Sequence, residues 1–176
     1  KIYELRVKIK NVISIHKYGA DMAVEIERKF LVTNDNGKAC ISHSVGIRQV
    51  YLGPLSRSSV RVRIEGDTAN INIKSATLGI RRTEYEYTIP MDDALEMLDH
   101  LSEQPQINKT RHFIPVDNHT WEIDEFYDDN DGLTVAEIEL NSEDEDFIKP
   151  EWLGQEVSDD QRYYNVNLIK HPFKNW

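Results

Sequence analysis

The sequence has little cysteine, a shortage of basic residues and no long apolar run, and each of these excludes a class of protein. Cys40 is the only cysteine among 176 residues, so no disulfide can form within the chain and we expect a cytoplasmic protein. Lysine and arginine number 21 against 31 acidic residues, and the net charge of −10 argues against binding to nucleic acids or anionic membrane surfaces. No apolar run approaches the roughly 20 residues of a membrane-spanning helix.

The shortage of basic residues does not extend to the first 21 positions. These residues have a net charge of +3, which leaves −13 for the rest of the chain. Met22 is followed by Ala-Val-Glu-Ile-Glu, which is typical of a natural start. We therefore expect residues 1–21 to be an added or upstream-translated leader and residues 22–176 to form a single domain. A native N-terminal strand or helix within residues 1–21 stays open as the alternative.

Short stretches that alternate apolar and polar residues dominate the pattern, and this period of two predicts β-strands. The stretches cover residues 24–32, 48–52, 60–65, 69–74, 83–89, 108–115, 120–126 and 133–140. Gly66-Asp67 joins the third and fourth as a hairpin. Helical signals lie at 91–101, at 142–145 and at 158–169, and residues 34–47 form a connection that carries a short helix or a lid. An α+β protein with a closed antiparallel barrel of eight strands accommodates all of these elements.

Charged residues occupy alternate positions of these strands, so that each set shares one strand face. In the first strand Glu25, Glu27 and Lys29 share a face, while Val24 and Ile26 lie on the other. The same pattern recurs as Arg61 and Arg63, Lys74, Glu84 and Glu86, Lys109 and Arg111, Glu122 and Asp124, and Glu137 and Glu139. For one strand alone, a solvated face with weak ion pairs explains the pattern. Its repetition across the chain favours a barrel with a charged interior and an apolar outer surface that packs against helices.

A charged interior needs partners, because buried charge is costly unless it is paired or ligated. The bases require an anion and the acids require cations. A polyphosphate chelated by a divalent metal satisfies both, since Mg²⁺ and Mn²⁺ prefer carboxylate oxygens and readily share phosphate oxygens. Arginine presents a planar fork to phosphate oxygens, and lysine presents a mobile point charge.

The order of the charged motifs resembles the CYTH superfamily, the triphosphate tunnel metalloenzymes, and most of all its short bacterial tripolyphosphatase-like branch. The likeness runs from about Val24 to Leu168. It rests on Glu25-Ile26-Glu27-Arg28-Lys29, Arg48-Gln49-Val50-Tyr51-Leu52, Arg61-Val62-Arg63, Ile71-Asn72-Ile73-Lys74, Arg82-Thr83-Glu84-Tyr85-Glu86, Lys109-Thr110-Arg111, Trp121-Glu122-Ile123-Asp124 and Ala136-Glu137-Ile138-Glu139. The chain departs from the family pattern at Val50, Asn72 and His112, where glycine, threonine and an aromatic residue are usual.

The resemblance implies an eight-stranded tunnel and assigns roles by position. Divalent metal, Mg²⁺ or Mn²⁺, is expected at Glu25, Glu27, Glu137 and Glu139. Triphosphate is expected to bind Lys29, Arg61, Arg63, Lys74, Lys109 and Arg111, with Arg48 and Arg162 as further candidates.

The resemblance further implies metal-dependent hydrolysis of a triphosphate, with inorganic tripolyphosphate split into pyrophosphate and phosphate. Lys29, Arg61, Arg63 and Lys74 would stabilise the transferring phosphoryl group. A carboxylate that orients the attacking water is expected among Glu84, Glu86, Asp124 and Glu139, and the sequence does not choose between them.

Several alternatives to this hydrolase stay open. A class IV-like adenylate cyclase or a thiamine triphosphatase would use the same tunnel, and a non-catalytic polyphosphate or nucleotide binder would use its charges without turnover. In each case the expected partner is a small triphosphate, with no nucleic acid and no membrane. Both a monomer and a homodimer are compatible with the sequence.

Overall fold

The computed structural model describes residues 24–53, 57–102 and 105–176. The predicted leader at 1–21 lies outside these residues. The strands are β1 (Val24–Val32), β2 (His43–Tyr51), β3 (Ser58–Glu65), β4 (Thr68–Ser75), β5 (Arg81–Thr88), β6 (Ile107–Val116), β7 (His119–Phe126), β8 (Thr134–Glu139) and β9 (Leu153–Glu156). The helices are α1 (Met91–His100) and α2 (Asn165–Leu168), with 3₁₀ helices η1 (Asp35–Cys40), η2 (Asp128–Asn130), η3 (Gln161–Tyr163) and η4 (Phe173–Asn175).

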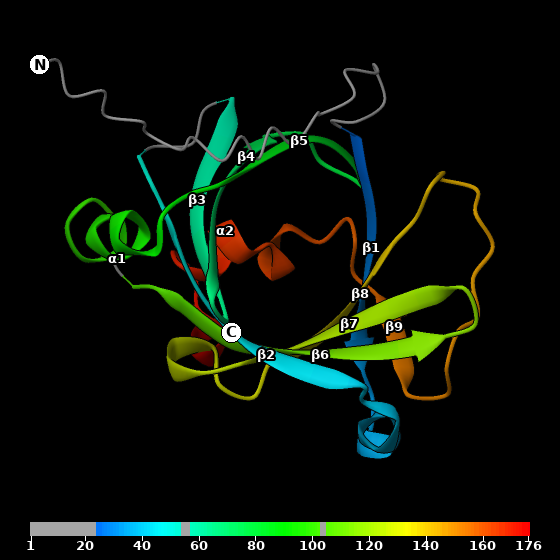
Figure 1. Cartoon of the computed structure of the whole chain (residues 1–176). Helices are drawn as coiled ribbons and strands as arrows, with labels where there is room; N and C mark the ends of the chain where they lie inside the picture. The colour runs from blue at the N-terminus through cyan, green and yellow to red at the C-terminus, as the bar shows by residue number, and fades with distance from the viewer. Residues whose placement is uncertain (1–23, 54–56, 103–104) are drawn as a thin grey trace, which may run out of the picture.

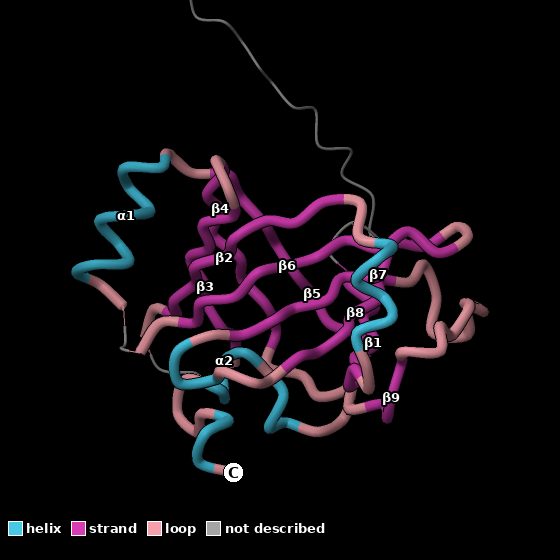
Figure 2. Tube along the Cα trace, turned by 90° about the horizontal axis from the view of Figure 1, so that it is seen from below, coloured by secondary structure: helices cyan, strands magenta, loops and turns pink. Residues whose placement is uncertain are grey.

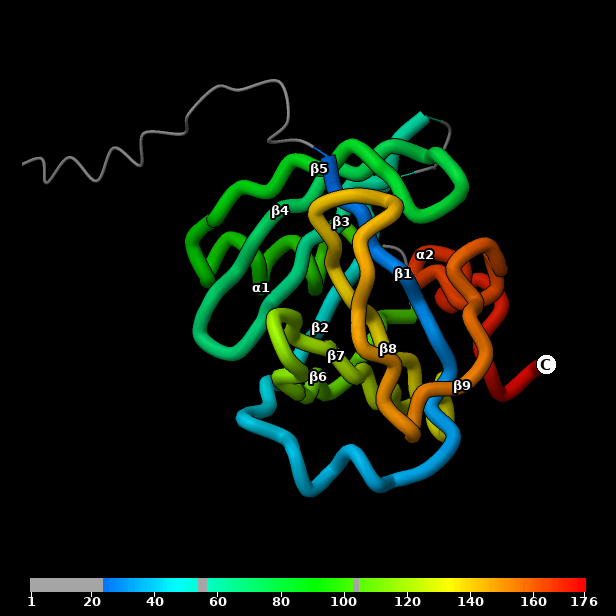
Figure 3. Tube along the Cα trace, turned by 90° about the vertical axis from the view of Figure 1, so that its right-hand side faces the viewer, coloured from blue at the N-terminus to red at the C-terminus, as the bar shows by residue number. Residues whose placement is uncertain are grey.

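Eight of the strands close into an antiparallel barrel, which Figure 1 shows along its axis. The order around the ring is β5-β4-β3-β2-β6-β7-β8-β1, and β1 returns to β5, where Val24 pairs with Thr83. The ninth strand, β9, lies outside the ring and pairs with β1 (Figure 3). The predicted α+β protein with an eight-stranded closed barrel is therefore confirmed.

The outer faces of the strands carry the apolar core, as the alternation of charged residues predicts. On one side Val50, Val62 and Ala69 pack against Ala94 and Leu98 of α1, which lies outside β3 (Figure 1). On the other side Phe30, Ile114, Trp121 and Ile138 form a cluster that Trp152 covers. Because apolar residues cover the outside, the opposite, charged faces of the same strands point into the barrel.

The C-terminal segment closes one end of the barrel. Tyr51, Ile107 and Phe126, near the ends of β2, β6 and β7, pack with Leu168 and Ile169 in one apolar cluster. Figures 1 and 2 show α2 and its flanking coil across this end. Together these residues separate the charged interior from solvent at that end. Within the residues that the structure describes, no helix is both long and apolar enough to cross a membrane.

Two predicted helices differ from the structure. Residues 142–145 form a turn, in which the Glu145 carboxylate accepts hydrogen bonds from the backbone and side chain of Asn141. The predicted helix at 158–169 shortens to residues 165–168 after η3, because Tyr164 is extended and its hydroxyl donates to the Ser158 carbonyl over 2.9 Å. The pattern also gave no sign of β9, whose four residues are too few to show a period.

Candidate active site

Opposite charges occupy opposite halves of the barrel wall. The acidic half consists of the inner faces of β7, β8, β1 and β5, which are consecutive around the ring, and the basic half consists of those of β4, β3, β2 and β6. The acidic half carries Glu25, Glu27, Lys29, Arg82, Glu84, Glu86, Glu122, Asp124, Glu137 and Glu139. The basic half carries Gln49, Tyr51, Arg61, Arg63, Glu65, Asn72, Lys74, Lys109 and Arg111. The β2 strand contributes no charge to this inner wall.

Glu25 and Glu27 form the centre of the acidic half. The two carboxylate oxygens of Glu25 accept hydrogen bonds from Lys74 Nζ at 2.9 and 2.8 Å, and Glu27 Oε1 accepts one from Arg82 Nη2 at 3.1 Å. Burial, and then the neighbouring Glu27, raise the pKa of Glu25 to about 7. Burial acts in the same direction on Glu27, but Lys29 and the other nearby cations outweigh it and lower the pKa of that carboxyl. The positive charge around Glu25 is therefore too small to offset the effects of its burial and of Glu27 on its pKa.

Arg111 and Lys109 of β6 join the basic half to the acidic half at β7 and β8. Arg111 donates from Nε to Asp124 Oδ1 over 2.7 Å and from Nη2 to Glu137 Oε2 over 2.6 Å, and it also pairs with Glu122. Lys109 pairs with Asp124, whose side chain is 0% exposed. Burial lowers the pKa of Lys109 to about 7 despite this partner. Burial would raise the pKa of Asp124, but Arg111 and Lys109 hold it well below its usual range.

A second contact between the halves runs from β3 and β4 to β5. Lys74 Nζ lies 3.0 Å from Glu84 as well as against Glu25. Arg61 Nη2 lies 3.7 Å from Glu84, and Arg63 Nη2 lies 3.2 Å from Glu86. The halves thus neutralise each other across both of their boundaries.

The structure brings the predicted site residues together on the inner wall with two exceptions, Arg48 and Arg162, and it leaves one member of the wall, Glu139, exposed. Arg48 lies on the outer face of β2, the face of Val50, and its Nη2 donates to Gln106 over 3.3 Å. The Arg162 side chain is 63% exposed and pairs with Asp160 at 2.6 Å. Glu139 is exposed near the end of β8, where the register places it opposite Glu27. Arg48 and Arg162 are therefore separate from the cluster. Arg48 lies on the outer face of its strand, and Arg162 lies in η3, outside the barrel wall.

Sequence reasoning missed five interior residues, which are Arg82, Asn72, Tyr51, Gln49 and Glu65. Arg82 bonds Glu27, and Asn72 donates to Glu84 over 2.8 Å and accepts from Arg61 Nε over 3.3 Å. Tyr51 and Gln49 are buried on the inner face of β2. Arg82 and Asn72 stand two residues from a predicted ligand in their strands, so the period of two was the signal that could have found them.

The Glu25 and Glu27 pair fits a hard divalent cation. In residues 24–53, 57–102 and 105–176 no three side chains of the His, Cys, Asp and Glu types converge as a ready-made metal cage, because lysines and arginines lie between the carboxylates. Mg²⁺ commonly uses only one or two protein carboxylates and completes its shell with water and substrate phosphates. The raised pKa of Glu25 shows that this carboxylate gains from an added positive charge. Glu25 and Glu27 therefore suit such an ion.

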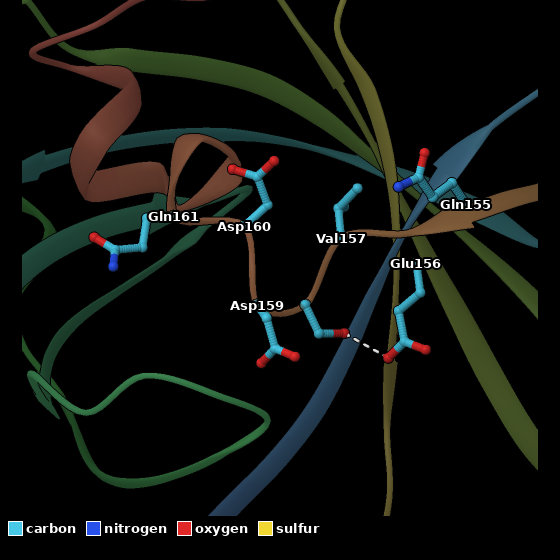
Figure 4. Close-up of a pocket in the computed structure, with 7 residues that line it drawn as sticks. Gln155, Glu156, Val157, Asp159, Asp160 and Gln161 are labelled. Atoms are coloured by element: carbon cyan, nitrogen blue, oxygen red, sulfur yellow. Dashed lines mark hydrogen bonds between the residues drawn. The ribbon is translucent and has the colours of Figure 1, made fainter.

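A pocket also lies along the end of β9 and the segment that follows it, lined by residues 155–161 (Figure 4). Within it the Ser158 hydroxyl donates to Glu156 Oε1 over 2.8 Å. It contains none of the residues predicted for the site, and the charged barrel interior remains the candidate active site.

Comparison with known proteins agrees with this geometry. A family model described as the CYTH domain matches residues 23–166. An inorganic triphosphatase of Acetivibrio thermocellus is 45% identical over 155 residues, which cover 88% of this chain and 99% of the relative. An inorganic triphosphatase of Nitrosomonas europaea is 39% identical over 149 residues, 82% of this chain and 95% of the relative. The crystal structure of the inorganic triphosphatase NE1496 superposes with a TM-score of 0.60 at 33% identity and covers 82% of this chain and 93% of its own. The chain belongs to the CYTH domain family.

Proposed function

We propose that this chain is a metal-dependent inorganic triphosphatase, which hydrolyses tripolyphosphate to pyrophosphate and phosphate. The observation that carries the proposal is the division of one buried interior into an acidic half and a basic half. A chelated polyphosphate has the matching division, since its phosphates are anionic and its metal ions are cationic. The two relatives named inorganic triphosphatases support the same substrate.

The basic half would bind the phosphates. Arg61, Arg63, Lys74, Lys109 and Arg111 line it, and Lys29 adds a further cation from the adjoining acidic half. Most of these side chains are buried, so their attraction to phosphate oxygens is screened less than at a surface. Arginine can also hold two oxygens of one phosphoryl group at once. These residues therefore fix the position of the triphosphate. They also stabilise the negative charge that develops on the phosphoryl group during its transfer.

The acidic half would hold the metal, Mg²⁺ or Mn²⁺. Glu25 and Glu27 are its ligands, and Glu137 and Glu139 of β8 lie on the neighbouring strand, where Glu139 pairs in register with Glu27. When bound, the ion shields the phosphate charge and polarises the P–O bonds. Removal of metal is then expected to abolish turnover while the protein stays folded.

Hydrolysis forms a bond between a water oxygen and a terminal phosphorus and breaks the bridging P–O bond, so that pyrophosphate leaves and the water proton passes to a carboxylate or to solvent. Asp124 is a poor acceptor for that proton, because Lys109 and Arg111 occupy its oxygens and lower its pKa. Its role is to position these two bases. Glu84 and Glu86, which share the Asn72 amide, remain better placed to orient the water.

The substrate class also suits the rest of the chain. The net charge of −10 disfavours nucleic acid and anionic membrane surfaces, and a small anion can reach an enclosed basic half. Cys40 is free and exposed, which supports a cytoplasmic location. A monomer or a homodimer is compatible with a site that lies within one barrel.

A phosphate-release panel tests the proposal. Tripolyphosphate, pyrophosphate, ATP and thiamine triphosphate are each assayed with Mg²⁺, with Mn²⁺ and with chelator. We expect release from tripolyphosphate in metal alone, at a higher kcat/KM than from the organic triphosphates. Cyclic AMP with pyrophosphate from ATP would identify a cyclase instead, and tight binding without release would identify a binding module. Undiminished turnover in chelator would contradict the metal mechanism.

A further inference from the structure

Gln49 is a buried amide in the centre of the basic half. It lies on β2 next to Val50, which packs outward against α1, so the Gln49 side chain points into the barrel. In the register it is opposite Arg63 of β3 on one side and Ile107 of β6 on the other. Its exposed fraction is 0%. Nothing in the family resemblance or in the charge pattern gives this residue a role.

Within the part of the chain that the structure describes, neither Gln49 Nε2 nor Gln49 Oε1 has a hydrogen-bond partner, and Arg63 Nε also lacks one. A buried polar group without a partner lowers stability, and such groups persist where a ligand or water supplies the partner. Asn72 gives a contrast, because it has the same exposed fraction of 0% but bonds both Arg61 and Glu84. Burial in this barrel therefore does not by itself leave an amide unpaired.

The neighbours of Gln49 identify the missing partner as an anion. Arg63 is opposite it, Arg61 is opposite Tyr51 two residues on, and Lys109 lies two residues from Ile107 on the other side. Gln49 Nε2 and Arg63 Nε are both donors, so they suit an acceptor such as a phosphoryl oxygen. The Gln49 carbonyl can accept from a protonated phosphoryl oxygen. The amide thus suits a phosphoryl group in either protonation state.

We propose that Gln49 and Arg63 Nε bind an unsubstituted terminal phosphoryl group of the substrate and position the triphosphate within the basic half. This inference rests on the proposed function and specifies one of its contacts. The group must be terminal, because Gln49 is fully enclosed and the apolar cluster of Tyr51, Ile107 and Phe126 begins beside it. The nucleoside or other organic end of a substituted triphosphate has no place there.

The test compares triphosphate affinity with stability in a Gln49→Met variant, which keeps the side-chain length and removes both polar atoms. We expect the Kd for tripolyphosphate, measured by calorimetry in chelator, to rise about tenfold to a hundredfold. We also expect the urea midpoint of the free protein to stay or to increase, since two unpaired atoms are gone. An unchanged Kd would overturn the inference. If the urea midpoint also falls, the amide is held by buried water and its role is structural.

A matched control is Asn130→Leu. Asn130 is also a buried amide, but it accepts a hydrogen bond from the Phe173 backbone over 2.9 Å and lies outside the barrel interior. This variant should lose stability and keep the wild-type Kd, the reverse of Gln49→Met. If both variants weaken binding equally, the effect at Gln49 is a general one and the inference fails.

Gln49→Glu keeps the test decisive if the methionine variant does not fold. Its carboxylate stands among Arg61, Arg63 and Lys109, so it is paired in the free protein and repels phosphate. Affinity should fall at least as far as in the methionine variant, and full affinity would overturn the inference. Absence of tripolyphosphate hydrolysis by the wild-type protein would refute the proposed function. Hydrolysis by the wild-type protein, together with unchanged tripolyphosphate affinity in the Gln49 variants, would refute this inference alone.

Discussion

The acidic and basic halves of the barrel wall differ in how they balance their charges. The acidic half carries two of its own cations, Lys29 and Arg82, beside Glu25 and Glu27. The basic half carries a single acid, Glu65, and depends on carboxylates from across its boundaries. Each half is therefore incomplete by itself, and the ion pairs between the halves supply partners for charges that burial would otherwise leave unpaired.

The perturbed pKa values show what each half lacks. In the acidic half burial and Glu27 raise the pKa of Glu25 to about 7, so this carboxyl tends to take up a proton. In the basic half burial lowers the pKa of Lys109 to about 7, so this ammonium tends to lose one. Both shifts reduce charge. A metal ion would restore the charge of Glu25, and a phosphate group would restore that of Lys109.

The largest effect is expected where one residue joins the halves. Arg111 pairs with Asp124, Glu137 and Glu122, and Arg111→Met leaves three carboxylates without this partner. Breaking a buried ion pair in this way costs about 3–5 kcal/mol. Urea denaturation should show a loss of this size. A loss below about 1 kcal/mol would mean that the two halves are not coupled through Arg111.

Removing a base from the basic half should weaken substrate binding. Arg61 is buried and hydrogen-bonded to Asn72, so Arg61→Ala removes a desolvated charge near the proposed phosphates. Steady-state assays with tripolyphosphate should show kcat/KM reduced about tenfold to a hundredfold. Arg48→Ala is the matched control on the outer face and should keep wild-type kinetics. Equal effects in the two variants would contradict the assignment of Arg61 to the inner face and Arg48 to the outer face of the barrel.

Titration of metal-free protein should give a stability minimum near pH 7. Glu25 keeps a proton in the folded protein between pH 4.5 and about 7, where the unfolded chain has lost it, so stability falls as pH rises. Folded Lys109 has lost its proton between about pH 7 and 10.5, where the unfolded chain keeps it, so stability rises with pH.

Urea midpoints across this range measure the effect, which is on the order of a few kcal/mol for each group. Glu25→Gln should remove the fall below pH 7, and Lys109→Met should remove the rise above it. If the stability of each variant follows the wild-type pH profile, Glu25 and Lys109 are not the groups whose titration sets the stability minimum.

The smallest effect is expected outside both halves. Arg162 pairs with Asp160 at the surface, and such pairs contribute less than about 1 kcal/mol. Arg162→Ala should therefore leave the KM for tripolyphosphate unchanged and shift the urea midpoint little. A large rise in KM would restore the role that the family resemblance gave this residue.

The period of two predicts the inner face for the charged residues that alternate along a strand. It placed Glu25, Arg61 and Lys109 on inner faces because alternation is a local property of each strand. It did not predict that acid-bearing strands are neighbours, since that depends on β1 closing between β5 and β8. It also does not separate Arg48 from the site, because the resemblance rests on a whole motif, whereas consecutive residues of a strand lie on opposite faces.

Tertiary contacts decided the remaining differences. Tyr164 ends the predicted final helix early through its bond to Ser158, a partner six residues away that no helical period reveals. The charge pattern assigns no role to Gln49, because an amide carries no charge. Its isolation became visible only when the register placed it against Arg63 and Ile107.

Calorimetric titration of the protein with tripolyphosphate in chelator tests most directly whether the basic half binds phosphate and the acidic half binds metal. The Glu25→Gln, Glu27→Gln double variant should bind as tightly as wild type or more tightly, because repulsion from two carboxylates is gone, and it should lose turnover in Mg²⁺. Arg61→Ala should lose affinity under the same conditions. An equal loss of affinity in the acidic and basic variants would contradict the account of a metal-binding half facing a phosphate-binding half.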